Sequence, residues 1–331
     1  MKGSAGGILF VVAALLVVGV ALPLVFWVTG SPFIARLGQL VLLTVVLTIA
    51  LNLLTGTAGL LALDSVVFLG FGAYTGAILS TRFGTSFPVE LLVAVAGTAV
   101  IAFLLGLLLV RLHSVFFAVA TVGLAVSFYT TVLNWGDLTR GAMGIPAIPP
   151  VRIAGYELDG WLATYMLAAL MALVAVFVGH RMTHSFYGNA ARAIREDEDA
   201  ARSMGLTPRF IKAQIYAVHG ALMAMAGVLY AHVNSFVGPD NFLLLESALI
   251  LTAIVIGGLG SLPGAVLGAV LVVLAPEMLR QFGDLRAIIF GVILFLAILF
   301  LPRGLLSEVR SLAWVRRLDP ASPWARRKRR S

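Results

Sequence analysis

The sequence predicts an all-α polytopic membrane protein with about ten transmembrane helices, some of them short or discontinuous. Three observations predict this class. Hydrophobic residues make up 60% of the chain and charged residues 11%, whereas soluble domains have roughly 25% charged residues. Several apolar runs reach the length of about 20 residues that a helix needs to cross a bilayer. The runs lack the two-residue alternation of a membrane β-barrel, so the predicted spans are helices.

The first apolar run, residues 6–28, is expected to be a retained first span. Its apolar stretch of about 20 residues exceeds the 7–15 of a signal-peptide core. The stretch "ALP" at 21–23 is also a poor cleavage site, because proline follows the small residue. We therefore count this run among the crossings.

The basic residues between the predicted spans indicate how the spans are oriented in the membrane. Segment 181–212 carries six Lys or Arg residues and the stretch from Arg303 onward carries nine, ending in "WARRKRRS". Basic loops face the cytoplasm, so both segments and both termini are predicted to be cytoplasmic. Ten spans are predicted: 8–28, 38–55, 64–81, 90–110, 115–134, 161–180, 211–233, 247–259, 262–276 and 287–301.

The stretch 247–276 could be one span or two. Two cytoplasmic basic segments require an even number of crossings between them, and a single span here would give an odd number. A division at the glycines 257, 258 and 260, with Pro263 just after, restores the even number. The two pieces are short, so a tilted, re-entrant or discontinuous geometry is expected. Non-helical backbone at membrane depth is tolerated where it is buried or lines a cavity. We therefore expect this hairpin to lie near the functional site of the protein.

Composition excludes several classes of site. The chain has no cysteine, so it has neither disulfides nor thiolate metal sites. Its five histidines fall in no metal-ligand spacing, and no phosphate-binding loop with the pattern G-x-x-x-x-G-K-[ST] occurs. A basic tail can indicate nucleic acid, but directly after a last span it is typical of the cytoplasmic side and of contact with anionic membrane lipid. No nucleic-acid partner is expected.

A charged insert interrupts the apolar pattern. Four consecutive acids run from Glu196 to Asp199, and residues 190–204 are predicted to form one short helix. Arg195 could pair with Asp199, and Glu198 with Arg202, each four residues apart. Gly205 is placed to end the helix, and Pro208 prevents its resumption. A narrow apolar stripe is predicted at Ala190, Ala193, Ile194, Ala201 and Met204.

Two interpretations of the insert stay open from its residues alone. It could be a solvated connector between the sixth and seventh spans. A connector needs polarity, but it needs neither an alanine stripe nor an abrupt glycine stop. A helix with one small-residue face and dense charge suits docking into a groove on a soluble partner.

Several segments resemble the branched-chain amino acid (Liv-type) ABC importer permeases. "RAIREDEDAARSMGL" (192–206) is similar to the cytoplasmic coupling segment of that family, and "LNLLTGTAGLLAL" (51–63) with "FLGFGAY" (68–74) to its amino-terminal signature. The stretch 238–280 is similar to its carboxyl-half signature, and 290–306 to its closing span. The extra amino-terminal span fits the longer of the two permease subunit types.

The resemblance implies a subunit that pairs with a second permease, two cytoplasmic ATPases and a periplasmic or lipid-anchored solute-binding protein. ATP and Mg²⁺ would bind the ATPases, with no cofactor and no enzymatic activity on this chain, in a bacterial inner membrane. The implied domain is a permease domain at 1–306, with a coupling segment at 184–209 and a basic cytoplasmic tail at 307–331. The coupling residues would be Arg192, Ile194, Arg195, Glu196, Asp197, Glu198, Asp199, Ala200, Ala201 and Gly205.

The chain departs from the family pattern at Ala62-Leu63-Asp64 and at Thr139-Arg140-Gly141. A carboxylate within a span costs about 2.5–3.5 kcal/mol at the helix centre, so Asp64 has two interpretations. It could sit at the wetted cytoplasmic edge of its span, or inside the passage, where it could meet a substrate ammonium group. The predicted passage residues are Asn52, Thr55, Thr57, Asp64, Ser65, Gly258 and Gly260.

Other functions stay open at this stage. An ABC permease for urea or short amides would share the fold. An ion-coupled secondary transporter would use Asp64 as a proton or sodium site and would work without ATPases. A non-transporting scaffold would use its polar residues in spans as packing contacts. Association with ATPase subunits distinguishes the importer from the other two classes.

Overall fold

The computed structural model describes residues 32–300 except 113, 154, 159 and 284. The predicted first span at 8–28 and the basic tail at 307–331 lie outside the described residues. Within them the fold is helical, with eight helices that are long and apolar enough to cross a membrane. This confirms the predicted class of all-α polytopic membrane protein. A further helix, α13 (Leu285–Phe300), has 16 residues and corresponds to the predicted closing span.

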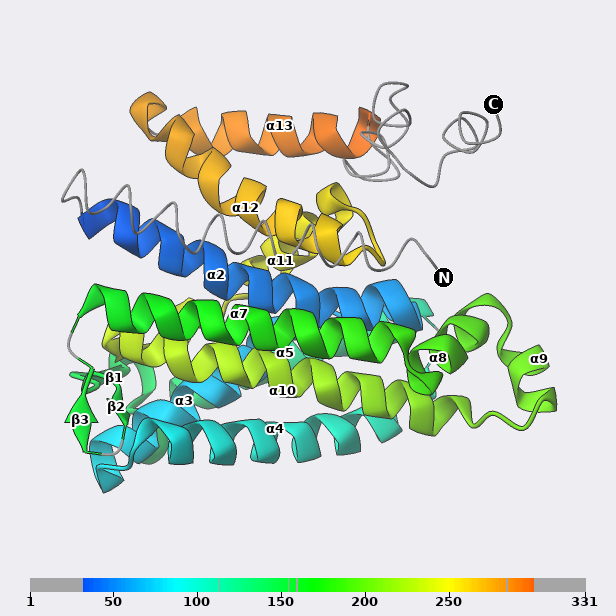
Figure 1. The fold of residues 1–331 in the computed structure, drawn as a ribbon, viewed down its shortest axis with the longest axis horizontal. Coiled ribbons are helices and arrows are strands. Elements are labelled where there is room, and N and C mark those ends of the chain that lie inside the picture. Colours follow the sequence, from blue (N-terminus) through cyan, green and yellow to red (C-terminus); the bar gives the residue numbers. More distant parts are fainter. Residues whose placement is uncertain (1–31, 113, 154, 159, 284, 301–331) are drawn as a thin grey trace, which may run out of the picture.

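The long helices follow the predicted apolar runs closely (Figure 1). Most ends differ from the prediction by four residues or fewer, whereas α2 begins at Pro32, six residues before the predicted 38. Two of the ends have clear local causes. Gly84 ends one helix in the left-handed conformation at φ 60°, and Pro208 begins another, because proline is tolerated in a first helical turn. The helices are α2 (Pro32–Asn52), α3 (Ser65–Phe83), α4 (Phe87–Leu109), α5 (Ser114–Asn134), α7 (Trp161–His184), α10 (Pro208–Asn234), α11 (Leu244–Gly257) and α12 (Leu262–Met278).

Helix α10 lies at the centre of the bundle, between α3, α4 and α2. Small residues let its backbone touch that of α3. A Cβ atom added to Gly72 would lie 2.2 Å from the carbonyl oxygen of Ala224, and one added to Gly227 would lie 2.1 Å from that of Leu69. Close backbone approach through small residues is the usual way that helices associate in membranes. The glycines of these helices are therefore packing positions.

Short strands mark one end of the bundle, which we call the strand end. Strand β1 (Ile145–Pro146) pairs antiparallel with β4 (Phe236–Val237), and β2 (Arg152–Ile153) with β3 (Tyr156–Glu157). The short helix α6 (Gly136–Thr139) lies in the same connection. His232 ties this connection to the bundle, since its imidazole contacts the carbonyl oxygen of Pro149 at 2.8 Å and a carboxylate oxygen of Glu90 at 2.6 Å.

The opposite end, which we call the charged end, carries α8 (Phe186–Glu196) and α9 (Glu198–Ser203) (Figure 1). The predicted division of 247–276 is confirmed: α11 ends at Gly257 and α12 begins at Leu262. Gly258 and Gly260 have φ of 116° and 78°, a conformation that favours glycine. Helices α10 to α13 run in alternating directions, and α13 ends toward the charged end.

Candidate functional site

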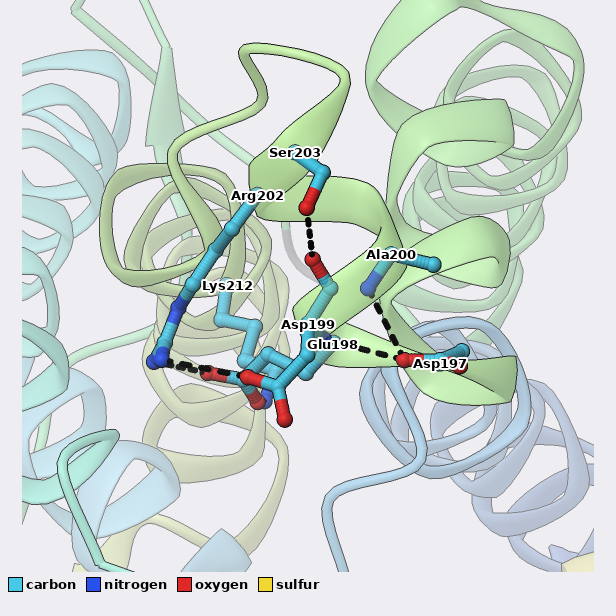
Figure 2. Close-up of polar contacts among 7 residues, drawn as sticks. All are labelled: Asp197, Glu198, Asp199, Ala200, Arg202, Ser203 and Lys212. Carbon is cyan, nitrogen blue, oxygen red and sulfur yellow. Dashed lines mark hydrogen bonds and ion pairs between the residues drawn. The ribbon is translucent and has the colours of Figure 1, made fainter.

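The charged insert forms two helices, so the predicted single helix over 190–204 is wrong. The break falls at Asp197, whose backbone is extended at φ −152° and ψ 108°. A carboxylate oxygen of Asp197 accepts hydrogen bonds from the backbone N–H groups of Asp199 at 3.0 Å and Ala200 at 2.9 Å (Figure 2). Asp is a preferred helix N-cap. Asp197 therefore caps α9 and does not continue α8.

The predicted apolar stripe is also partly wrong. Ala190, Ile194 and Ala201 are buried as predicted, and Ala191 joins them, whereas Ala193 is exposed and Met204 is 75% exposed. The buried members pack against the helices of the same chain. The small-residue face therefore anchors α8 and α9 to the bundle. A partner would meet the opposite face, which carries Met204 and the acids.

One carboxylate ties α9 to the body of the protein. Glu198 accepts hydrogen bonds from Arg202 and from Lys212 at the start of α10, each at 2.7 Å (Figure 2). Partial burial raises the pKa of Glu198, but Lys212 and Arg202 outweigh burial and hold it below the ordinary 4.5. Exposed ion pairs contribute little to stability. The Lys212 side chain is only 11% exposed, so its pair with Glu198 is the anchoring contact.

Arg195 makes a different contact from the predicted one. The break at Asp197 removes the helical register between Arg195 and Asp199. The guanidinium donates instead to the backbone carbonyl of Gly56, 139 residues earlier in the chain. The predicted pair of Glu198 with Arg202 does form, and the predicted stop at Gly205 holds, with φ 83°.

The other predicted coupling residues divide into anchored and exposed ones. Arg192 donates to the carbonyl oxygen of Thr183 and to Asn189, each at 2.6 Å, and so fixes the corner between α7 and α8. Glu196, Asp199 and Ala200 are exposed, and the Asp199 side chain is 93% exposed. A cavity of about 560 Å³ separates this segment from the ends of neighbouring helices, with Gly59, Arg111, Arg195 and Lys212 in its wall.

The predicted passage residues lie in two places. Asn52 and Gly260 meet directly, since the side-chain oxygen of Asn52 accepts the N–H of Gly260 at 2.8 Å. Asp64 and Ser65 lie at the start of α3. Between the two places, Leu53–Thr57 forms a π-helical turn that contains Thr55 and Thr57, and residues 59–64 are non-helical. All predicted passage residues except Gly260 are buried.

Side chains from other helices accept backbone N–H groups at the end of this non-helical stretch and in the first turn of α3. The hydroxyl of Thr121 on α5 accepts the N–H of Leu63 at 3.1 Å, and the hydroxyl of Ser247 on α11 accepts that of Val66 at 3.1 Å. Buried backbone donors need such partners where water is absent. The stretch is therefore held in place by two distant helices.

Asp64 does not lie at a wetted edge, so that interpretation is wrong. Its side chain is fully buried, and the Tyr216 hydroxyl of α10 donates to one carboxylate oxygen. The other oxygen has no hydrogen-bond partner among the described residues. Phe68 and His219 surround Tyr216, with ring centroids 5.3 and 6.0 Å away. Sequence analysis missed Tyr216 and His219, because only the fold brings α10 beside residue 64.

With this geometry in view, the chain can be compared with known proteins. A family model described as "Branched-chain amino acid transport system / permease component" matches residues 33–300. The chain belongs to this permease family. The match includes α8, α9 and the divided hairpin, so the resemblance predicted from sequence is confirmed.

Individual relatives agree with this assignment. The chain is 33% identical to the high-affinity branched-chain amino acid transport system permease protein LivM of Escherichia coli over 325 residues, 91% of this chain and 75% of LivM. LivM of Salmonella typhimurium is 34% identical over 90% of this chain and 74% of its own length. The permease protein LivH of Escherichia coli is 28% identical over 154 residues, 45% of this chain and 46% of LivH. No solved structure gives a significant match.

Because the chain belongs to this permease family, it is a multi-pass membrane transport protein. Its similarity to LivM extends over most of both chains, whereas its similarity to LivH covers less than half of each. This agrees with the prediction of the longer permease subunit type.

Proposed function

We propose that this permease is one membrane subunit of an ATP-driven importer for branched-chain or related amino acids. The observation that carries the proposal is the charged end. Helices α8 and α9 are anchored to the bundle by Ile194, Ala201 and the Lys212–Glu198 pair, and they present Glu196, Asp199 and Met204 outward. A rigidly anchored, exposed helical segment can receive a push from a soluble partner.

The proposed partners follow from the family. Because the chain is similar to both LivM and LivH, we propose a second, related permease as its companion in the membrane. Two ATPases would dock on the charged end and a solute-binding protein on the strand end. ATP and Mg²⁺ would bind the ATPases, in agreement with the missing phosphate-binding loop of this chain. The charged end would then face the cytoplasm of a bacterial cell.

We place the passage beside the buried polar atoms near α2 and α3. The hydroxyls of Thr55 and Ser65 and one oxygen of Asp64 are buried and form no hydrogen bond with described residues. Buried polar groups are nearly always hydrogen-bonded to protein or water. Water or a polar solute would satisfy these atoms during transport. A carboxylate among them favours a solute with an ammonium group, as in an amino acid, over urea or a neutral amide.

The proposal is tested by purification and transport. The tagged permease, expressed with its neighbouring genes, should carry ATPase subunits through purification. Reconstituted with ATP inside and the solute-binding protein outside, it should accumulate leucine, isoleucine or valine without an ion gradient. Uptake that follows a proton or sodium gradient and ignores ATP would establish the secondary transporter instead. Uptake of urea in preference to amino acids would reassign the substrate.

A further inference from the structure

Arg195 makes the one contact among the described hydrogen bonds that joins α8 to the π-helical turn after α2. Its guanidinium donates to the Gly56 carbonyl. Its aliphatic stem crosses Gly59, where an added Cβ atom would lie 2.7 Å from Arg195 Cγ and 3.0 Å from Cδ. Gly59 also has φ 71°, so both space and backbone favour glycine there. The guanidinium and the middle of the arginine stem therefore both contact the segment 56–59.

Gly56 in turn touches the turn between α11 and α12. A Cβ atom on Gly56 would lie 2.5 Å from the Gly260 nitrogen and 2.7 Å from the side-chain oxygen of Asn52. That same oxygen accepts the N–H of Gly260 at 2.8 Å. The backbones of Gly56 and Gly260 are therefore in direct contact, and the Asn52 side chain holds Gly260 in this position by its hydrogen bond. Contacts with so little space transmit a displacement instead of absorbing it.

The segment that contains Gly56 departs from regular α-helix. Leu53–Thr57 is a π-helical turn followed by non-helical backbone at 59–64. Turns of this kind are rare and are frequent at functional sites. The cavity of about 560 Å³ borders Ala58, Gly59 and Arg195 on the other side. Residues 56–59 thus contact Gly260 on one side and Arg195 on the other, and Ala58 and Gly59 border the cavity. We call this arrangement of Arg195, residues 56–59 and Gly260 the joint.

We propose that Arg195 is a positioning residue that transmits displacement of α8 and α9 to the α11–α12 turn through Gly56. This inference rests on the proposed function, because the displacement would come from the ATPases. The inference adds to the proposed function a route for the displacement. Arg195 would act on Gly56, and Gly56 would act on Gly260, which the Asn52 side chain holds by a hydrogen bond. The α11–α12 turn would follow α8 and α9 as one body.

The test compares Arg195→Met, which keeps much of the stem and removes the donor, with Arg195→Lys, which keeps a charge and a donor. Arg209→Met is the matched control. Arg209 also donates from its side chain to a backbone carbonyl, that of Leu107 at 2.9 Å, but it lies outside the joint. The chain has no native cysteine, so spin labels can be attached to single cysteines introduced in place of Met204 and Leu259. These two residues are 75% and 48% exposed.

In the assembled wild-type complex, trapping the ATP-bound state should move both labels together and leave the distance between them unchanged. In Arg195→Met that distance should change on ATP binding, and solute transported per ATP should fall about five-fold or more, as for coupling between distant sites. Arg195→Lys should lie between the two, and Arg209→Met should match wild type. Thermal stability and retention of the ATPases identify a variant that has lost its fold or assembly.

Two results overturn the inference. If Arg195→Met, folded and assembled, keeps both the wild-type label distance and the wild-type ratio of solute to ATP, the route lies elsewhere. If Arg195→Met and Arg195→Lys both fail to fold or assemble, Arg195 is a structural residue and the inference is also wrong. If the wild-type complex shows no response to ATP at all, the proposed function itself fails, and the inference fails with it.

Discussion

The buried pair of Asp64 and Tyr216 allows a test of whether the Asp64 charge serves the fold or the proposed transport. The Tyr216 hydroxyl holds one carboxylate oxygen of Asp64, and the other has no partner among the described residues. Asp64→Asn keeps an oxygen that can accept from Tyr216 and removes the charge. The fold should therefore survive, while an ammonium group would lose its counter-charge.

We expect Asp64→Asn to change the midpoint of thermal unfolding little and to lower uptake of amino acids about tenfold. A hydrogen bond to a charged group contributes about 1.5–3 kcal/mol, which corresponds to at least that factor. Uptake assays on leucine and on urea, with melting curves of the same preparations, check this. Unchanged uptake of every solute would remove Asp64 from the passage.

Glu198 gives a prediction on pH. Its folded-state pKa lies below 4.5, because Lys212 and Arg202 outweigh the effect of burial. A carboxylate with a lowered pKa contributes stability above its unfolded pKa, and that contribution is lost as the pH falls through the folded value. A nitroxide at Met204 should keep its mobility from pH 7 to 4.5 and become mobile below 4.5. Glu198→Gln should abolish this transition, and a transition above pH 4.5 would contradict the assignment.

At the scale of elements, apolar length and glycine placement were enough to predict the spans. The division at Gly257 followed from the even number of crossings between two basic segments. The break at Asp197 was not predictable in the same way, because four acids in a row also fit a continuing helix. The structure has two helices because Asp197 adopts an extended backbone and caps α9. Burial of Asp64 escaped prediction because Tyr216 lies 152 residues away.

Helices α8 and α9 should respond differently to proline. Ala193 lies in the interior of α8, where proline lacks the backbone N–H of a helical hydrogen bond and its ring clashes with the carbonyl four residues earlier. Ala193→Pro should therefore cost about 3 kcal/mol and disrupt α8. Ala200 lies in the first turn of α9, where proline removes one cap bond of about 0.5–2 kcal/mol. ATP-driven uptake should be lost in Ala193→Pro and largely kept in Ala200→Pro. Wild-type uptake in Ala193→Pro would mean that α8 is only a connector.

At the scale of the whole molecule, the bundle has two chemically different ends (Figure 1). One end carries short strands and the Glu90–His232 contact, and the other carries α8, α9 and their charges. Basic residues at the charged end predict that it faces the cytoplasm. This orientation can be tested at positions within the described residues.

Cysteines introduced at Ser86, Ala147 and Asn241 should react with an impermeant reagent from outside the cell, because all three lie at the strand end. A cysteine at Ser203 should react only after the membrane is opened, because α9 lies at the charged end. The native chain supplies no competing cysteine. Labelling of Ser203 from outside in intact cells would invert the orientation.

The exposed acids of α8 and α9 are the groups that the proposed ATPases would meet first. Glu196 and Asp199 are exposed, and the Arg202 pair of Asp199 at 3.5 Å is exposed too, whereas Asp197 caps α9 and Glu198 binds Lys212. Charge reversal at Glu196 and Asp199 therefore keeps the cap and the Lys212 contact. The deciding measurement is leucine uptake per ATP hydrolysed in proteoliposomes that hold the complete complex. We predict that Glu196→Lys with Asp199→Lys abolishes uptake or the ATPase response to solute, while insertion of the chain is normal. Wild-type uptake per ATP in that variant would contradict the account.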